Sequence, residues 1–561
     1  MDNKGYRNWE EPSFPREEER CAEDQAAVVT GRPDFQMRLH ISPIELGLVG
    51  YFLRSILWRW IAACSGCGNP GDCGIRFRMT QRSVFFAVIF AVVAFALPAI
   101  DSLHAQNLAP TPPMGWNSWD AYGFTIDESD FKANVTVLAG MKQYGWSYAV
   151  IDEGWYMADP FGANLEARKY LWDGNGYLIP VEKRFPSSAN GAGFKPLADW
   201  VHAQGLKFGI HIVRGIPRQV VKDNLPIAGS SFHAADVADM DSPCPWDEGN
   251  WGVKDNAAGQ AYYDGMLKLY ASWGLDFIKV DCISDRPYRI TEIKQIAEAI
   301  KKTGRPIVLS LSPGPTNLQH AAEVAKYAQM WRIADDHWDL WAGNHKAGES
   351  EFPFGVKDEF DRLAAWAPYA KPGGWPDADM LPEGSLTPHP GWGDPRQSRY
   401  TQDEQRTEFT LWAISRSPLI YGGNLTKLDD FTRALMTNRD VMEIDQKASS
   451  VPIENLFELN NKSATKLLIK DMPGFEHIRI WQATILRSSP DEDVYYAFFN
   501  LDDKPATLNV AWSQLLGTPD KQTAWNVWER TKLKQSNTLE MDLPAHGCAL
   551  YRTRVRINVT M

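Results

Sequence analysis

Short apolar segments alternate with longer amphipathic segments along the chain from Pro112 onward. The short segments have the length of buried strands, whereas the longer ones repeat their apolar residues with the period of a helix. The predicted strands are residues 147–152, 207–212, 277–281, 306–312, 328–332 and 417–421. The predicted helices are residues 127–144, 194–204, 259–273, 290–303, 318–327, 401–415 and 428–437.

An alternation of this kind predicts parallel strands that are joined by helices. With a further strand at Met114 and another near Pro372, about eight such units fit into roughly 330 residues, as in a barrel with long loops. We therefore predict an α/β fold with a (β/α)8 TIM barrel over residues 106–447. A doubly wound open sheet is the alternative, but no G-x-G-x-x-G motif follows the first strand.

The pattern changes after about residue 448, where short apolar segments follow one another with turn residues between them. These segments are residues 466–470, 477–481, 494–500, 507–512, 524–528, 539–543 and 546–552. Several short strands without helices between them predict a C-terminal antiparallel β-sandwich over residues 448–561.

The N-terminal region has a different character. Residues 1–78 show no pattern of a fold, and we expect a non-native or disordered extension. Residues 79–105 combine a basic start, an apolar run and a small-residue site, which together predict a secretory signal peptide. A membrane anchor is the alternative, but Pro98 and Asp101 keep the apolar run below the ~20 residues that a spanning helix needs. We expect the protein to be periplasmic or secreted, and to have no stable membrane span after the signal peptide is cleaved.

Composition and cysteine usage narrow the class of partner. The net charge of −12 and the lack of a basic stripe argue against a nucleic-acid partner. Three cysteines, Cys244, Cys282 and Cys548, follow the predicted cleavage site, so the protein is not a disulfide scaffold. At most one bridge could form among them, and we do not predict it.

The predicted strand at residues 277–281 carries two charged residues. Lys279 and Asp281 point to the same side, because strand side chains alternate with period two. A buried charged pair is costly unless it is paired or used, and catalytic groups collect at the carboxyl ends of barrel strands. Other polar and aromatic residues are expected at the same edge: Trp116, Trp119, Asp152, Glu153, His211, Ser312, Arg332, Asp335 and Asp336.

This set of residues favours one reaction class. The chain contains no serine-hydrolase, zinc-protease or phosphate-loop motif. Carboxylates together with aromatic rings are typical of enzymes that cleave glycosidic bonds. If the strand stays extended, Asp336 shares a face with Arg332 while Asp335 points away, so we assign Asp336 to the pocket. The alternative is that the two aspartates form a helix cap and a surface charge.

Seven stretches of the chain, which follow one another in the family's order, resemble the motifs of glycoside hydrolase family 27, the melibiase-type α-galactosidases of clan D. The matching stretches are Pro112–Trp119, Tyr148–Trp155, Trp273–Asp281, Trp331–Asp336, Pro372–Leu381, Leu411–Leu419 and Ala545–Arg552. They extend over nearly all of the chain that follows the predicted signal peptide.

The resemblance implies a retaining exo-glycosidase, most often an α-galactosidase that releases terminal α-D-galactose through a covalent glycosyl-aspartate. It implies that Asp281 is the nucleophile and Asp336 the acid/base, and Lys279 should keep the pKa of Asp281 low. The substrate-binding residues expected on this basis are Trp119, Asp152, Glu153, His211, Lys279, Ser312 and Arg332. The partner is a carbohydrate, and no metal or other cofactor is expected, because two carboxylates suffice.

The chain departs from the family pattern where the sugar is recognised. Glu153 stands where α-galactosidases usually carry a second aspartate, and His211 where many members have tyrosine. Ser312 stands where animal α-galactosidases have glutamate and α-N-acetylgalactosaminidases have serine. Cys282 directly follows the nucleophile, one residue earlier than the usual family cysteine, which leaves the usual pocket disulfide open.

Other activities therefore remain alternatives to α-galactosidase. They are β-L-arabinopyranosidase, α-N-acetylgalactosaminidase and isomaltodextran cleavage. A non-catalytic carbohydrate-binding protein is a further alternative, but both expected catalytic carboxylates are present.

Overall fold

The computed structural model describes residues 108–162, 164–343, 353–387, 394–454, 469–487, 491–517 and 521–556. The predictions for residues 1–78 and for the signal peptide lie outside these ranges. No helix among the described residues combines the length and the apolar character needed to cross a membrane.

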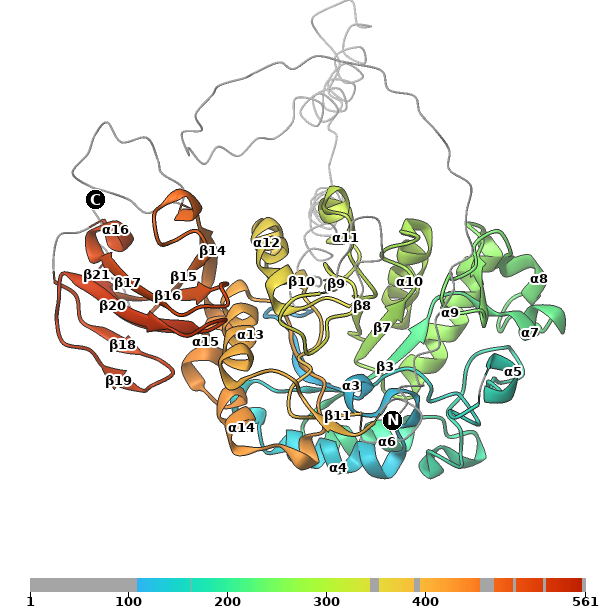
Figure 1. The fold of residues 1–561 in the computed structure, drawn as a ribbon. Coiled ribbons are helices and arrows are strands. Elements are labelled where there is room, and N and C mark those ends of the chain that lie inside the picture. The colour runs from blue at the N-terminus through green and yellow to red at the C-terminus, as the bar shows by residue number, and fades with distance from the viewer. Residues whose placement is uncertain are drawn as a thin grey trace, which may run out of the picture. The chain divides into compact units, whose positions relative to one another are not determined.

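Eight parallel strands form the central sheet of the described chain (Figure 1). They are β1 (Met114–Asn117), β2 (Tyr148–Ile151), β3 (Lys207–Val213), β7 (Phe277–Asp281), β8 (Val308–Leu311), β9 (Met330–Arg332), β10 (Trp375–Asp377) and β13 (Leu419–Tyr421). Their order is β10-β9-β8-β7-β3-β2-β1-β13. A parallel bridge between Leu381, just after β10, and Tyr421 in β13 joins the two ends of this order. The predicted (β/α)8 barrel is confirmed.

Helices follow most of the strands, and polar side chains cap the first turns of several of them. The main helices are α4 (Glu128–Ala139), α6 (Lys195–Ala203), α9 (Ala257–Ser272), α10 (Ile290–Thr303), α12 (Val356–Trp366), α13 (Gln402–Ser415), α14 (Asp430–Met436) and α15 (Arg439–Lys447). The Asn256 side chain accepts a hydrogen bond from the Gly259 N–H at the start of α9. Thr401 and Glu404 form a reciprocal capping box at α13.

Shorter elements connect the main ones. They are helices α3 (Trp119–Tyr122), α5 (Leu165–Arg168), α7 (Arg218–Lys222), α8 (Ala234–Val237) and α11 (Ala321–Val324), and strands β4 (Ile216–Pro217), β5 (Ala238–Asp239), β6 (Asn250–Val253), β11 (Ser385–Leu386) and β12 (Arg396–Gln397). The predicted helix at residues 318–327 is only a 3-10 turn followed by α11, because Asn317 caps the turn and the chain then enters β9. Helix α12 is absent from the sequence prediction, although its amphipathic pattern is regular.

The barrel interior follows the period-two alternation of the strands. In β7, Phe277 belongs to the small interior cluster, whereas Ile278 and Val280 pack with the helices. Lys279 and Asp281 therefore lie on the interior side, above Phe277. Gly209 is required in the neighbouring strand, because a Cβ there would lie 2.9 Å from Val150 Cγ2. A cavity of only about 20 Å³ remains at the level of Lys279, so the filled interior leaves the carboxyl ends of the strands for a ligand.

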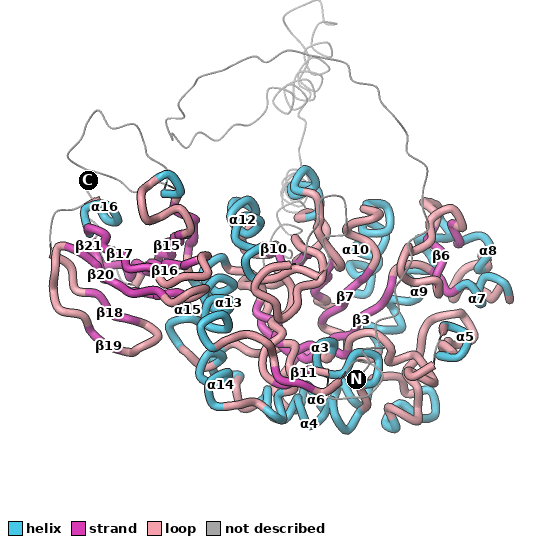
Figure 2. Tube along the Cα trace, viewed as in Figure 1, coloured by secondary structure: helices cyan, strands magenta, loops and turns pink. Residues whose placement is uncertain are grey.

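The strands of the C-terminal part pair antiparallel, as predicted, and Figure 2 shows them in magenta. One sheet has the order β14 (Ser449–Ile453), β15 (Ile478–Leu486), β16 (Asp491–Asn500), β21 (Cys548–Arg556), β18 (Ala524–Asn526) and β19 (Thr531–Lys532). The second pairs β17 (Ala506–Ala511) with β20 (Thr538–Leu543), and helix α16 (Trp512–Leu516) follows β17. The predicted strand at residues 466–470 is wrong where it is described, because Ile469–Asp471 forms a 3-10 turn.

Each face of the larger sheet has its own packing partner. Phe498 packs with Leu508 and Val510 of the second sheet in one apolar cluster. Tyr495 and Phe499 belong instead to the main core that contains the barrel helices. The sheet thus packs on the second sheet with one face and on the barrel with the other, as the alternation of side chains requires.

Candidate active site

Asp281 is the last residue of β7 and is held by three neighbours. The Trp246 indole N–H donates to Asp281 Oδ1 at 3.1 Å, and the Ser312 hydroxyl donates to Oδ2 at 3.3 Å. His211 Nε2 lies 3.5 Å from the same Oδ2. Burial opposes ionisation of Asp281, but His211, then Lys279 and Trp246, outweigh it and lower the pKa below the usual 3.8. The carboxyl is therefore a carboxylate at neutral pH.

Lys279 pairs with Asp152 rather than with Asp281. Its ammonium lies 2.9 Å from Asp152 Oδ2, which also accepts a hydrogen bond of 2.7 Å from the Asn117 amide. Burial opposes the charge of Asp152, but Lys279 and then His211 hold its pKa well below the ordinary value. Lys279 was expected to keep the pKa of Asp281 low, and it does so only after His211.

A second group of carboxylates surrounds Arg332, whose buried guanidinium lies at the end of β9. Its Nη2 lies 2.7 Å from Asp379 Oδ2 and 3.3 Å from Asp336 Oδ1. Desolvation raises the pKa of Asp336 to about 7, with Asp379, Asp335 and Asp281 adding to the rise and Arg332 opposing it. At neutral pH this carboxyl is about half protonated, so it can donate a proton.

Asp335 has partners of its own, and the strand-face argument does not apply to it, because β9 already ends at Arg332. Its carboxylate pairs with Arg286, while its backbone carbonyl accepts a hydrogen bond of 2.7 Å from Arg332. The alternative of a helix cap fails, because no helix begins at either aspartate.

The pKa values of Glu153 and His211 are both raised above their ordinary values. Burial raises the pKa of Glu153 to about 8, and the charges of Asp247, Asp281 and Asp152 add to the rise against His211. Burial lowers the pKa of His211, but Asp152 and Asp281 outweigh it and raise the value above 6.5. Glu153 is thus mainly a neutral acid at pH 7 and offers both a donor and an acceptor to a sugar hydroxyl.

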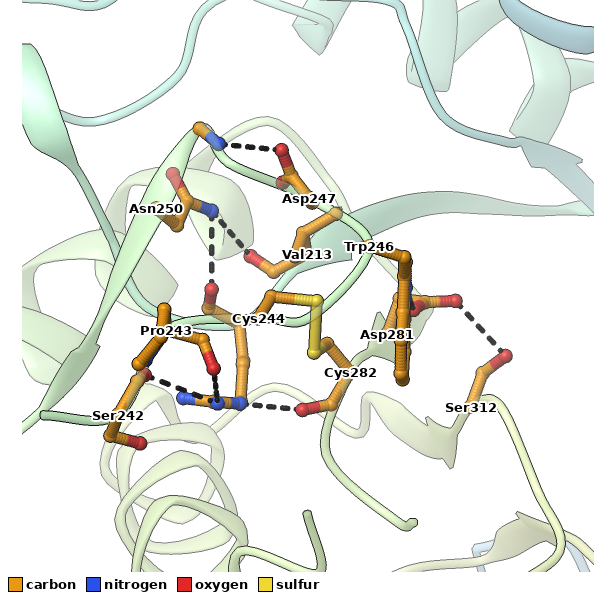
Figure 3. Close-up of a disulfide and its surroundings, with 12 residues drawn as sticks. Val213, Ser242, Pro243, Cys244, Trp246, Asp247, Asn250, Asp281, Cys282 and Ser312 are labelled. Carbon is orange, nitrogen blue, oxygen red and sulfur yellow. Dashed lines mark hydrogen bonds between the residues drawn. A yellow bond between two sulfur atoms is a disulfide. The ribbon is translucent and has the colours of Figure 1, made fainter. Parts of the chain in front are cut away.

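A disulfide joins Cys244 to Cys282, with an S–S distance of 2.16 Å (Figure 3). The sequence left open whether a bridge forms among Cys244, Cys282 and Cys548, and the structure pairs the first two. Cys282 adopts a positive φ of 60°, which turns its side chain toward the loop that carries Cys244. The bridge therefore survives although this cysteine stands one residue closer to Asp281 than in the family pattern.

Each predicted residue lies at the carboxyl end of the barrel strands or directly after it. Trp119 opens α3 after β1; its backbone N–H donates to Asn117 Oδ1 at 2.8 Å, and its ring packs edge-on against Phe124 at 5.1 Å. The sequence analysis missed Asp379, although it lies in one of the matching motifs. It also missed Trp246, which no strand end could reveal, because it lies on a loop between β5 and β6.

A barrel with carboxylates at its strand ends, followed by a β-sandwich, is the architecture of a glycosidase. The family described as alpha galactosidase A matches residues 247–447, and its C-terminal beta sandwich domain matches residues 480–553. A β-L-arabinopyranosidase of glycoside hydrolase family 27 from Geobacillus stearothermophilus is 38% identical, with a TM-score of 0.70, over 80% of this chain and 98% of that one. The chain belongs to glycoside hydrolase family 27.

Curated relatives are more distant and carry another activity in their names. Alpha-galactosidase A of Cellvibrio japonicus is 28% identical over 460 residues, which cover 80% of this chain and 94% of that protein. Alpha-galactosidase 3 of Arabidopsis thaliana is 27% identical over 452 residues, covering 80% and 82%. The protein is therefore a family 27 glycoside hydrolase whose relatives act on more than one sugar.

Proposed function

We propose that the protein is a retaining exo-glycosidase with Asp281 as nucleophile and Asp336 as acid/base. The observation that carries this proposal is the opposite pKa shift of two carboxyl groups at the same end of the barrel, one at the end of β7 and one just after β9. The pKa of Asp281 is lowered, whereas that of Asp336 is raised to about 7. One carboxylate and one carboxylic acid at the same pH are what a two-step displacement needs.

In the first step, Asp281 attacks the anomeric carbon and the bond to the leaving oxygen breaks, while Asp336 gives that oxygen its proton. In the second step, Asp336 takes a proton from water, whose oxygen displaces Asp281 from the anomeric carbon. The net result is hydrolysis with retained configuration. For this geometry we expect the two carboxyl groups to lie about 5–5.5 Å apart when the sugar is bound.

The charged pairs support recognition of a sugar by its hydroxyl groups. Asp152 and Lys279 are buried together, and Arg332 is fixed between carboxylates, so their hydrogen-bonding atoms are held in place before a sugar arrives. The substrate that these groups receive is a terminal pyranoside at the end of a carbohydrate chain.

We propose a terminal β-L-arabinopyranoside as the preferred substrate. This sugar has the ring configuration of an α-D-galactopyranoside but lacks the hydroxymethyl group on C5. Glu153 is one methylene longer than aspartate and leaves correspondingly less room for such a group. The arabinopyranosidase that is 38% identical to this chain supports the same choice. The α-D-galactoside is the second candidate, favoured by the names of the curated relatives.

The test is a panel of p-nitrophenyl glycosides with the full-length protein. We expect hydrolysis of the β-L-arabinopyranoside and slower hydrolysis of the α-D-galactoside, with the first product released in the configuration of the substrate. Asp281→Gly should lose at least about 10³-fold in kcat and recover activity with azide. Asp199→Ala, on the outer face of α6, is the matched control, because its carboxylate is 56% exposed and pairs only with Lys195.

Two results would contradict the proposal. Release of the inverted anomer would exclude the retaining mechanism. Binding of the sugars without hydrolysis of any glycoside would favour a carbohydrate-binding protein.

Export remains part of the proposal: a mature N-terminus at Gln106 would support it, whereas an exported chain that retains Phe85 would rule out the signal peptide.

A further inference from the structure

Trp246 is an exposed aromatic residue beside the proposed nucleophile. Its side chain is 47% exposed, and its indole N–H donates to Asp281 Oδ1 at 3.1 Å. Figure 3 shows Trp246 next to Asp281, with Ser312 bonded to the other carboxylate oxygen. About half of the indole surface is thus open to solvent beside the carboxylate, where a ligand bound against Asp281 would cover it.

The loop that carries Trp246 is firmly attached. Two residues before it, Cys244 is bonded to Cys282, which directly follows the nucleophile. The buried guanidinium of Arg214 donates to the backbone carbonyls of Ser242 and Pro243 at 3.3 and 3.2 Å. A ring on such a loop is positioned before a ligand binds, which lowers the entropic cost of recognition.

The exposure of the Trp246 ring indicates which part of the substrate it would contact. Asp152 and His211, which the sequence analysis expects to bind the terminal sugar, are each only 1% exposed. The terminal sugar therefore lies deep, and the group attached to its anomeric carbon extends toward solvent. Trp246 is adjacent to the carboxylate that attacks this carbon, and it is exposed.

We propose that Trp246 is a specificity-determining residue, whose exposed ring contacts the leaving group while its N–H orients the carboxylate of Asp281. The proposal rests on the proposed glycosidase function. The leaving group is a sugar or an aryl alcohol, whose C–H or aromatic face packs on the indole. Because the N–H contact acts through Asp281, that half of the role is one of positioning.

Two variants separate the two roles. Trp246→Ala removes the ring and the N–H, whereas Trp246→Phe keeps an aromatic face and removes only the donor. The substrates are the glycosyl fluoride of the sugar that the wild-type enzyme hydrolyses best, whose leaving group is one atom, and the corresponding disaccharide.

For Trp246→Ala we expect the KM of the disaccharide to rise about tenfold while the KM of the fluoride stays within twofold. For Trp246→Phe we expect both KM values to remain near wild type. In that variant the acid limb of kcat/KM should move to higher pH, because Asp281 loses a hydrogen bond to its ionised form. Cys244→Ser breaks the disulfide that holds the loop. Like Trp246→Ala, it should raise the KM of the disaccharide and leave the KM of the fluoride nearly unchanged.

Leu486→Ala is the matched control, because this residue of β15 is also an exposed apolar side chain, at 66%. Equal losses of Trp246→Ala on both substrates, or no loss on either, would overturn the leaving-group contact while the glycosidase proposal stands. An unmoved acid limb in Trp246→Phe would overturn the positioning role. A wild-type protein that cleaves no glycosyl fluoride would overturn both proposals together.

Discussion

Asp379 is expected to control the protonation of Asp336, the proposed acid/base. Its carboxylate lies 2.7 Å from Arg332 Nη2 and so neutralises the guanidinium that also faces Asp336 at 3.3 Å. Asp379→Asn keeps an oxygen that can accept the His337 backbone N–H, which the aspartate accepts at 2.9 Å. The substitution therefore removes one charge and preserves the shape of the site.

The magnitude follows from the distance between Arg332 and Asp336. At 3.3 Å, a full positive charge stabilises a carboxylate by about 1.3 kcal/mol even at the dielectric constant of water, or about one pKa unit. A lower effective dielectric increases this value, so we expect the pKa of Asp336 to fall from about 7 by about one to two units. At pH 7 the protonated fraction then falls about fivefold to fiftyfold.

The assay is the pH profile of kcat/KM with a phenyl glycoside, whose poor leaving group needs the proton. We expect the basic limb to move from about 7 to lower pH in Asp379→Asn, because Asp336 loses its proton earlier. A glycosyl fluoride, which needs no general acid, should show little change at pH 7. Asp335→Asn is the comparison variant, with a smaller shift in the same direction, because Asp335 is neutralised by Arg286.

The reasoning would be refuted if the basic limb of Asp379→Asn stayed at its wild-type position. Equal losses on both substrates at every pH would also contradict it, because they would indicate a general disturbance of the site. Asp379 itself has a φ of 86°, which is strained for a residue other than glycine, and Asn tolerates this region as well as Asp does.

Three further predictions concern the sugar, the buried pair and stability. Glu153→Asp should shift the ratio of kcat/KM toward the α-D-galactoside by about tenfold, measured against the β-L-arabinopyranoside; an unchanged ratio would exclude Glu153 as the discriminating residue. Lys279→Met should raise KM more than tenfold for both sugars, because Asp152 loses its partner at 2.9 Å; wild-type KM would contradict its role in binding. Arg214→Met should lower the free energy of unfolding by about 3–5 kcal/mol in urea titrations, because the buried Glu292 loses its ion-pair partner and keeps only the hydrogen bond from Tyr263. The double change of Arg214 and Glu292 to methionine should recover only part of that loss, because Arg214 also donates to the carbonyls of Ser242 and Pro243.

Much of the fold follows from local patterns. The helix at residues 290–303 was predicted to its first and last residue, because its apolar period is regular and Gly304 ends it in the left-handed conformation. The helix predicted at residues 318–327 is divided into a 3-10 turn, Leu318–His320, and the short helix α11, which ends at Val324. Apolar residues at helical spacing do not show that a segment has room for a helix between two strands.

The sequence by itself indicated which carboxylates lie at the same end of the barrel. Period two places Lys279 and Asp281 on one side of a strand, and the rule for barrel strands brings Asp281 and Asp336 to one edge. Their partners could not be inferred in this way. Lys279 pairs with Asp152, which lies 127 residues away, and such a choice depends on the register between strands.

Only the tertiary structure decided the surroundings of the nucleophile. Trp246 lies on a loop with no periodic pattern, and its distance from Asp281 depends on a bridge across 38 residues. Asp379 reaches Arg332 only because β9 and β10 pair with Arg332 opposite Asp377. The pKa values depend on burial and on charges from several strands, and these long-range electrostatic terms exist only when the barrel has folded.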